Sequence, residues 1–327
     1  KSSYFFEVIS FIISKLIRLK KNEKKVLNQF KEHIKHVEKT NDLQKKSIIT
    51  NFNIEKEIKL FLAKKFIYFY LLKFLKPEFI IGEDLSYTRF FITLNAKKLN
   101  IKTAEIQHGS LDKNNVAYNL GEGLKKYKSI QKYYPDFFLS FGEYWINRYN
   151  IPSEHINLGF PFLEKNRFLL KQNVNKSILI VSNSINPKEI SKYTLKLNKI
   201  SKNKGYKIFL RPRPSEKKEI SFRYSSIMKI DNIVFDFNEN LYESISSHEI
   251  IVGDYSTVLF EALFFDKKVF LFDTIATKMY SKDQILPLIS YDNVDKIFDY
   301  NISFFENYKK KIWTENSLTN FTNFLKV

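Results

Sequence analysis

Two arginines that alternate with prolines form one candidate anion site. Arg211-Pro212-Arg213-Pro214 directly follows the apolar run Tyr206–Leu210, which predicts a β-strand. Each proline fixes its own φ and biases the preceding residue toward an extended backbone, so both guanidinium groups project from a stiff segment. Guanidinium groups match phosphate oxygens and do not deprotonate. We favour a phosphate site over a basic surface loop, because the remaining positive charge of the chain is mostly lysine.

A second candidate anion site lies at residues 253–257, with the sequence GDYST, after the predicted strand Glu249–Val252. These residues open a helical pattern, and the free N–H groups of a helix start bind phosphate. Ser256 or Thr257 can also serve as the N-cap, and the two roles are compatible. Glu261 lies one turn beyond Thr257 and can accept hydrogen bonds from ribose hydroxyls. The alternative for Glu261 is a solvated or ion-paired carboxylate.

Candidate acid–base groups also follow predicted strands. His108, in Gln107-His108-Gly109-Ser110, comes after the strand around 103–107 and can move a proton near neutral pH; its alternative is a structural histidine. Glu83 and Asp84 follow the strand Phe79–Gly82 and can orient an acceptor hydroxyl or act as base; their alternative is the ordinary preference of acids for helix starts. Ser184, in Ser182-Asn183-Ser184, is a candidate wall of a nucleotide pocket.

The elements that position these residues alternate between strands and helices from residue 77 onward. Other predicted strands are Phe137–Phe141, Ile156–Gly159, Ser177–Val181, Ile233–Phe235 and Val269–Phe272. We therefore predict an α/β fold with two Rossmann-like domains facing a cleft at the carboxyl ends of their strands. The predicted domains are an N-terminal helical segment (1–76), an acceptor-side domain (77–165) and a donor nucleotide-binding domain with C-terminal helices (166–327). The polar stretch Glu164–Lys176 is the predicted linker.

Composition excludes several classes of function. The 54 Lys+Arg against 35 Asp+Glu give a net charge of +19, which suits phosphorylated substrates, anionic membranes or nucleic acid. We set nucleic acid aside, because the charge is spread along the chain and no nucleic-acid motif occurs. The absence of cysteine excludes disulfides and thiolate chemistry. Motifs for dinucleotide, P-loop, serine-hydrolase and zinc sites are missing from the sequence.

The N-terminus carries a disproportionate share of the charge. Residues 1–50 contain 12 Lys+Arg and 5 Asp+Glu, so 12 − 5 = +7. The segment from Phe5 to Arg18 places Phe5, Val8, Ile9, Ile12, Ile13, Leu16 and Ile17 on one helical stripe. Lysines follow it directly, so residues 1–25 predict either a helix on an anionic membrane surface or a core-facing helix. We favour the core-facing helix, and we do not expect a membrane-spanning helix, because Glu7 and Lys15 interrupt the apolar run.

Taken together, the three motifs resemble bacterial surface-polymer transferases of the GT-B type. In the CDP-glycerol glycerophosphotransferases, a His-Gly-Ser/Thr, an Arg-x-His-Pro and an Asp-Tyr-Ser-Ser segment line the cleft. These segments match His108-Gly109-Ser110, Arg211-Pro212-Arg213-Pro214 and Asp254-Tyr255-Ser256-Thr257 within residues 79–273. The capsule and lipopolysaccharide transferases that use CMP-linked acidic sugars are also similar. Arg213 replaces the family's histidine; it can stabilise a departing phosphate but cannot donate a proton.

The resemblance implies a metal-independent, inverting glycosyltransferase without a cofactor. It would move a sugar from a nucleotide-activated donor, a CMP-linked nonulosonic or Kdo-like acid, to a capsule or lipopolysaccharide glycan. Its implied location is cytoplasmic or peripheral on the inner face of the membrane. Donor contacts would come from Ser184, Arg211, Arg213, Asp254, Ser256, Thr257 and Glu261, acceptor contacts from Glu83, Gln107 and Ser110, and the base would be His108 or Asp84. Two alternatives are a CDP-glycerol-type glycerophosphotransferase and a nucleotide-sugar 2-epimerase.

Overall fold

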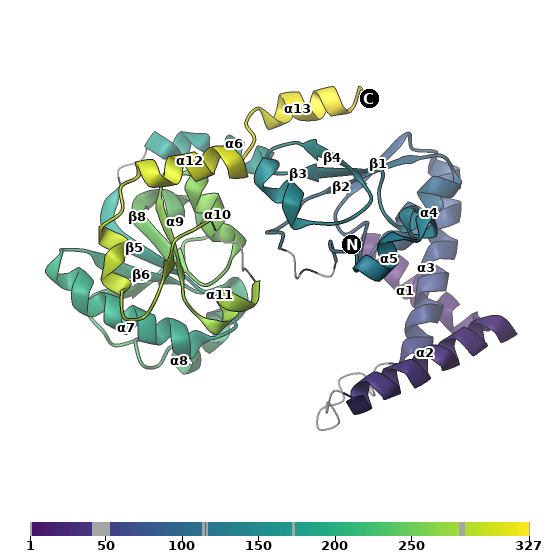
Figure 1. Cartoon of the computed structure of the whole chain (residues 1–327), viewed down its shortest axis with the longest axis horizontal. Helices are drawn as coiled ribbons and strands as arrows, with labels where there is room; N and C mark the ends of the chain where they lie inside the picture. The colour runs from purple at the N-terminus through teal and green to yellow at the C-terminus, as the bar shows by residue number, and fades with distance from the viewer. Residues whose placement is uncertain are drawn as a thin grey trace. The chain divides into compact units, whose positions relative to one another are not determined.

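The computed structural model describes residues 2–40, 53–112, 115, 117–171, 174–280 and 285–326. Of residues 2–5, 37–40, 122, 125, 147, 170, 171, 279 and 280 it describes only the backbone. The chain divides into two compact units (Figure 1). Unit 1 comprises residues 1–105 and 125–137, and unit 2 comprises residues 106–124 and 138–327. The domain boundaries predicted after residues 76 and 165 stay a prediction.

Unit 1 contains the predicted N-terminal helices, which are α1 (Ser2–Leu16), α2 (Lys21–Thr40) and α3 (Ile54–Leu75). The side chain of Asn53 caps α3 by accepting a hydrogen bond from the Lys56 N–H at 3.0 Å. The helix ends at Lys76, whose φ of 46° is left-handed, and the following Pro77 cannot continue a helix. The C-cap of α3 is therefore the last residue of the predicted N-terminal helical segment (1–76). The predicted helical segment also spans residues 41–52, which lie outside the described residues.

The first sheet has four strands in the order β1-β2-β3-β4. Within unit 1, β1 (Phe79–Gly82) pairs in parallel with β2 (Lys102–Ile106), and α4 (Phe90–Lys98) connects them. The buried side chains of Leu72, Ala96 and Ile101 join α3, α4 and the start of β2 in one apolar cluster. The elements that follow are α5 (Glu122–Lys125), η2 (Lys128–Tyr133), β3 (Phe137–Ser140), η3 (Glu143–Arg148), β4 (Glu154–Asn157), α6 (Pro161–Lys165) and η4 (Arg167–Lys171).

Unit 2 is built around a six-stranded sheet in the order β10-β9-β8-β5-β6-β7, with every pair parallel. Its strands are β5 (Asn175–Val181), β6 (Lys207–Arg211), β7 (Ile233–Phe235), β8 (His248–Gly253), β9 (Lys268–Phe272) and β10 (Leu288–Ile289). Its helices are α7 (Pro187–Asn203), η5 (Pro214–Glu219), α8 (Ile220–Arg223), α9 (Leu241–Ser247), α10 (Thr257–Phe264), α11 (Ile275–Tyr280), η6 (Val294–Phe298), α12 (Ser303–Ile312) and α13 (Ser317–Phe324).

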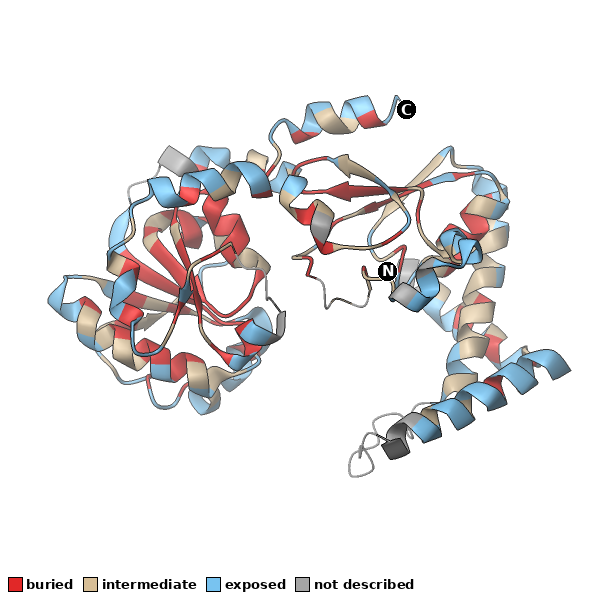
Figure 2. Cartoon of the chain, viewed as in Figure 1, coloured by how far each residue is buried: buried red, intermediate tan, exposed pale blue. Residues whose placement is uncertain are grey.

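The core of unit 2 lies in the strands and in the inward faces of the helices, drawn red in Figure 2. Ile178, Leu179 and Ile180 of β5 are 0% exposed, as expected for a central strand covered on both faces. Boundaries differ from the predicted ones by one or two residues at most strands, for example β4, predicted at 156–159 and found at 154–157. The sequence pattern missed β10, which is only two residues long. The described residues of the predicted linker include the end of α6, η4 and the first two residues of β5.

None of the helices in the described ranges is long and apolar enough to cross a membrane.

Candidate functional site at the start of α10

The sheet of unit 2 reverses its strand order between β5 and β8. From β5 the chain proceeds to β6 and β7 on one side, then returns to place β8, β9 and β10 on the other side. Val181, the last residue of β5, lies opposite Gly253, the last residue of β8. A Cβ atom at residue 253 would lie 2.3 Å from the Val181 carbonyl oxygen, so only glycine fits there. In open α/β sheets ligands bind at such a reversal, outside the carboxyl ends of the strands.

Two of the predicted motifs meet at the start of α10. The Ser110 N–H donates a hydrogen bond of 3.1 Å to Thr257 Oγ1, and both residues belong to unit 2. Ser256 is the N-cap residue with an extended backbone (φ −152°, ψ 145°), and its side chain makes no capping hydrogen bond. The segment at 108–110 and the first turn of α10 therefore form one site, which contains backbone N–H groups and the hydroxyls of Ser110, Ser256 and Thr257.

His108 lies beside the buried Tyr118. The imidazole is exposed, and its Nδ1 is 3.1 Å from the hydroxyl of Tyr118, which is 3% exposed. This bond fixes the orientation of the ring. When the Nδ1–H donates to the tyrosine oxygen, Nε2 carries the lone pair that a general base needs. The geometry is compatible with the predicted role as base.

The side chain of Gln107 binds the backbone of the segment that contains His108. It is 1% exposed; its Nε2 donates to the Gly109 carbonyl at 2.7 Å, and its Oε1 accepts from the Phe141 N–H at 3.0 Å. Both ends of the amide thus bind backbone groups, one on its own turn and one just past β3. A supporting role fits these contacts better than the predicted contact with an acceptor.

The paired arginines have different surroundings. Arg211 Nη1 bonds Asp236 Oδ2 at 2.8 Å and Ser244 Oγ at 2.9 Å, and Nη2 bonds the Asn238 carbonyl at 2.8 Å. Arg211 therefore ties the ends of β6 and β7 to α9, and its fork is used within the protein. In contrast, Arg213 is exposed, and no contact of its guanidinium is found among the described residues. Of the two, Arg213 is the better candidate for a phosphate contact.

A buried carboxylate that sequence reasoning missed supports the Arg213 backbone. Glu216 is 1% exposed and accepts hydrogen bonds from the Arg213 N–H (2.8 Å), Arg223 Nε (3.1 Å) and the Tyr224 hydroxyl (2.8 Å). The Ser182 hydroxyl in turn donates to the Tyr224 oxygen at 2.7 Å, and Arg223 donates to the Ser184 carbonyl. This network joins the segments that follow β5 and β6. The signal in the sequence was Pro214 with a Glu two residues later, a helix-start pattern.

The residues after β5 form a tight turn. Ser184 has a left-handed φ of 66°, and its N–H donates to Ser182 Oγ at 3.0 Å. Asn183 is 3% exposed, and its Nδ2 has no hydrogen-bond partner among the described residues. The same holds for Asp254 Oδ2, at the neighbouring end of β8. Buried polar atoms without partners are uncommon and are available to a ligand or an ordered water.

Two acids on the β8–α10 segment are buried. Asp254 Oδ1 accepts a hydrogen bond from Thr274 Oγ1 at 2.7 Å, and burial raises the pKa of Asp254 to about 6. Glu261 is 9% exposed; burial raises its pKa, and the Tyr242 hydroxyl donates to its Oε2 at 2.7 Å. Glu261 is thus not the solvated carboxylate of the alternative interpretation. Its contact with ribose stays a prediction.

Glu83 and Asp84 belong to unit 1 and His108 to unit 2, so the choice of base between Asp84 and His108 stays open. Asp84 has a left-handed φ of 57°, and its carbonyl accepts the N–H groups of Tyr87 and Arg89. Glu83 is exposed. The pair lies in the turn between β1 and α4, not in the first turn of the helix, because α4 begins only at Phe90.

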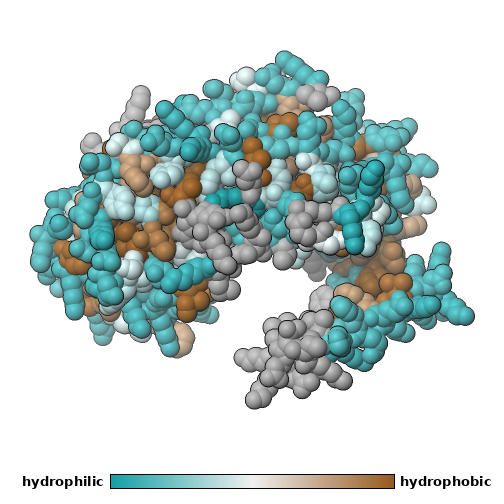
Figure 3. Space-filling model, viewed as in Figure 1, coloured by the Kyte–Doolittle hydropathy of each residue, from teal (hydrophilic) through white to brown (hydrophobic). Residues whose placement is uncertain are grey.

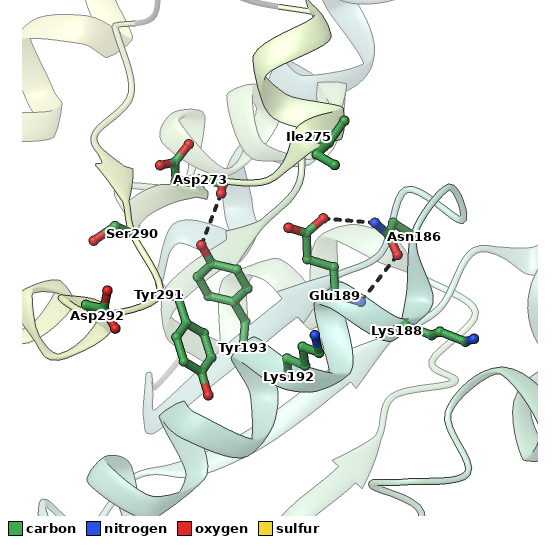
Figure 4. Close-up of a pocket in the computed structure, with 10 residues that line it drawn as sticks. All are labelled: Asn186, Lys188, Glu189, Lys192, Tyr193, Asp273, Ile275, Ser290, Tyr291 and Asp292. Atoms are coloured by element: carbon green, nitrogen blue, oxygen red, sulfur yellow. Dashed lines mark hydrogen bonds between the residues drawn. The ribbon is translucent and has the colours of Figure 1, made fainter.

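A cavity of about 780 Å³ lies in unit 2 at the ends of β9 and β10 and the start of α7 (Figure 4). Tyr193 crosses it and donates to the Asp273 carbonyl at 3.2 Å, while Asn186 Nδ2 bonds Glu189 at 2.9 Å. None of the predicted site residues lines it. Its lining combines both signs of charge with two tyrosines: Asn186, Lys188, Glu189, Lys192, Tyr193, Asp273, Ile275, Ser290, Tyr291 and Asp292.

Similarity to known proteins is confined to structure. No family model and no curated protein sequence matches the chain. The UDP-GlcNAc 2-epimerase from Methanocaldococcus jannaschii has a TM-score of 0.51 at 14% identity and covers 82% of each chain. The Neisseria meningitidis UDP-GlcNAc 2-epimerase bound to UDP-GlcNAc has a TM-score of 0.51 at 18% identity and also covers 82% of each chain.

The complex of S. aureus MnaA with UDP has a TM-score of 0.51 at 10% identity and covers 80% of this chain and 77% of the other. Identities this low establish the fold and nothing finer. The predicted fold class is confirmed: the protein is an α/β chain with the two-domain, Rossmann-like GT-B architecture and additional N-terminal helices.

Proposed function

We propose that the protein is an enzyme of nucleotide-activated sugars that holds the substrate phosphate at the start of α10. The observation that carries the proposal is the 3.1 Å hydrogen bond from the Ser110 N–H to Thr257 Oγ1, which joins the segment of His108 to the first turn of α10. A proton-transfer group and an anion site thus belong to one unit. Breaking a bond between a sugar and a phosphate requires both kinds of group.

The phosphate site would combine three kinds of donor. The first N–H groups of α10 have no partner within the helix, and the helix dipole adds positive potential there. Ser256 and Thr257 contribute hydroxyls on the same turn. Arg213, exposed and fixed by Pro212 and Pro214, would contribute a charged fork. Arg211 is left out of this contact, because its guanidinium binds Asp236, Ser244 and Asn238.

The reaction proposed first is glycosyl transfer with inversion and without a metal ion. Nε2 of His108 removes the proton of an acceptor hydroxyl, and the hydroxyl oxygen forms a bond to the anomeric carbon. The bond from that carbon to the nucleotide oxygen breaks, and its electron pair leaves with the phosphate. The α10 N–H groups and Arg213 stabilise the new charge. Glu83, which is exposed, and Asp84, which is half-buried, follow β1 and would orient the acceptor or supply the base.

The proposed donor is a CMP-linked nonulosonic or Kdo-like acid, with CDP-glycerol as the runner-up, and the proposed acceptor is a capsule or lipopolysaccharide glycan. Support for this choice comes from the three motifs and from the positive charge of the chain, which suits donors that carry negative charge beyond the nucleotide.

A 2-epimerase of nucleotide sugars is the second candidate. Its specific support is structural: two UDP-GlcNAc 2-epimerases match 82% of the chain. An epimerase would act on the bound sugar itself and would need no acceptor, so the two candidates differ in their products.

Two measurements test the proposal. A thermal-shift screen of CMP, CDP, UDP and GDP should show one nucleotide that raises the Tm by roughly 5 °C at saturating concentration. Incubating the matching activated sugar without an acceptor then separates the candidates, since only an epimerase produces the epimeric sugar. A chain that binds none of the four nucleotides would refute the proposal.

A further inference from the structure

Helix α1 turns apolar side chains outward and small polar ones inward. Ser10 and Ser14 are 1% and 4% exposed, whereas Phe11, Ile12 and Leu16 are 46%, 56% and 77% exposed. A surface helix of a water-soluble protein normally shows the opposite pattern. The prediction of a core-facing helix is thus only half correct, because one side of the apolar stripe packs inward and the other side faces water.

The inward side of α1 packs on α3 within unit 1. The rings of Phe6 and Tyr68 lie 6.0 Å apart, and Lys64 of α3 pairs with Glu7 at 2.8 Å. Ile9, Ile13 and Ile17 are half-buried. These contacts fix the rotation of the helix, so the outward direction of the remaining apolar residues is set by packing. We call Val8, Phe11, Ile12 and Leu16 the outer face of α1; the side chain of Phe5 lies outside the described residues.

A basic flank borders the outer face. Six exposed cations lie within residues 15–25, and the acids of residues 6–25 are Glu7, which pairs with Lys64, and Glu23, which accepts from the Lys20 N–H at 2.6 Å. Lys15 Nζ lies 4.9 Å from the centre of the Phe11 ring, so charge and apolar surface are directly adjacent. The members of the basic flank are Lys15, Arg18, Lys20, Lys21, Lys24 and Lys25.

We infer that the outer face of α1 and its basic flank dock the protein onto an anionic lipid bilayer. Figure 3 shows hydrophobic surface in the α1–α3 part of the chain next to the hydrophilic surface of α2. An amphipathic helix with apolar residues beside a row of lysines binds in the plane of a membrane interface. Each cation near an anionic leaflet adds attraction, and long side chains keep their charges at the headgroups.

A second copy of this chain is the weaker choice of occupant. A symmetric contact would place the six cations of one basic flank near the same six of the other copy, with Glu23 as the acid within it. Like charges at a contact are repulsive, whereas a leaflet of anionic lipid is complementary to them. No described helix spans a membrane, so the inferred contact is with the surface of the bilayer.

Vesicle binding by the whole chain tests this inference. The protein should cosediment with vesicles of phosphatidylcholine and phosphatidylglycerol, and far less with vesicles of phosphatidylcholine alone. The triple variant Phe11→Ser/Ile12→Ser/Leu16→Ser should lose the binding. The variant Lys20→Glu/Lys21→Glu/Lys24→Glu/Lys25→Glu should weaken it by about 100-fold or more, and added salt should weaken binding of the unchanged protein.

Unit 2 supplies matched controls. Phe222 is 86% exposed, and Phe222→Ser should leave vesicle binding unchanged. The same holds for a quadruple Lys→Glu variant at the exposed residues Lys199, Lys202, Lys217 and Lys218. Circular dichroism and nucleotide binding test whether each variant is folded. Nucleotide binding does not depend on the membrane contact.

Three results would overturn the inference: no binding of the unchanged protein to anionic vesicles, equal binding by the α1 and Phe222 variants, or a concentration-dependent dimer that the triple Ser variant abolishes in place of vesicle binding. Failure of the nucleotide screen would leave this inference standing, since α1 and the start of α10 belong to different units.

Discussion

The side chain that orients the His108 ring is Tyr118. Their 3.1 Å contact allows His108 to act as base only when Nδ1 carries the proton and Nε2 the lone pair. The change Tyr118→Phe removes this contact and should lower kcat about tenfold, with little change in KM. Tyr87→Phe, at an exposed tyrosine of unit 1, should have no effect. An unchanged kcat in Tyr118→Phe would exclude His108 as an oriented base.

Asp254 should make the stability of the protein depend on pH. Its pKa is about 6 in the folded chain against an ordinary 3.8, so the folded state binds the proton more tightly than the unfolded state. The free energy of unfolding should therefore fall as pH rises from about 4 to 6, by up to about 3 kcal/mol from this group. Asp254→Asn should be more stable than the unchanged protein near neutral pH and should lack this part of the slope. Denaturant unfolding curves across this range measure it, and parallel pH dependences of the two proteins would contradict the account.

At the scale of single residues, the sequence predicted positions better than partners. Arg211 and Arg213 lie at the carboxyl end of β6 as expected, but the sequence could not show that Arg211 binds Asp236, which is 25 residues away. The same limit applies to Glu261, whose carboxylate meets Tyr242. These pairings depend on how strands and helices pack, and a local sequence pattern does not contain that information.

At the scale of elements, Gly253 allows β8 to end against β5. A Cβ atom there would lie 2.3 Å from the Val181 oxygen, a backbone atom that cannot rotate away. Gly253→Ala should destabilise the protein by about 1–3 kcal/mol and weaken nucleotide binding, because the turn into α10 would shift. Gly121→Ala is the matched control, since nothing lies within 4 Å of the Cβ position there. Equal Tm values for the two variants would show that this close approach is unimportant.

Strand and helix order followed from the sequence, because apolar runs of strand length alternate with helical patterns and end in polar or Gly-containing turns. The boundaries of β7 match the predicted range. The sequence pattern missed β10, because its two residues are too few to show a period. The sequence also could not predict which side of α1 faces outward, because the apolar stripe covers both the outer face and the packed face.

At the scale of the whole molecule, the charge of +19 has no single explanation. In unit 1 the exposed cations of residues 15–25 border an apolar face, and in unit 2 the charge proposed to meet substrate is Arg213. The two Rossmann-like domains were predictable from the order of strands and helices, and the GT-B type from the resemblance of the motifs, whereas the proposed chemistry depends on a few contacts at the start of α10. The absence of a cofactor and of a metal stays a prediction.

The central claim is that α10 and Arg213 hold the phosphate of a nucleotide. The most direct test is calorimetry with two ligands, the nucleotide found in the thermal-shift screen and its nucleoside. Binding of each is measured to Thr257→Val, to Arg213→Ala and to the control Arg167→Ala. Arg167 pairs with Glu315 on the surface of unit 2. The account predicts that Thr257→Val and Arg213→Ala lose about tenfold or more in nucleotide affinity and keep their nucleoside affinity. The control Arg167→Ala should keep both affinities. Unchanged nucleotide affinity in both Thr257→Val and Arg213→Ala would contradict it.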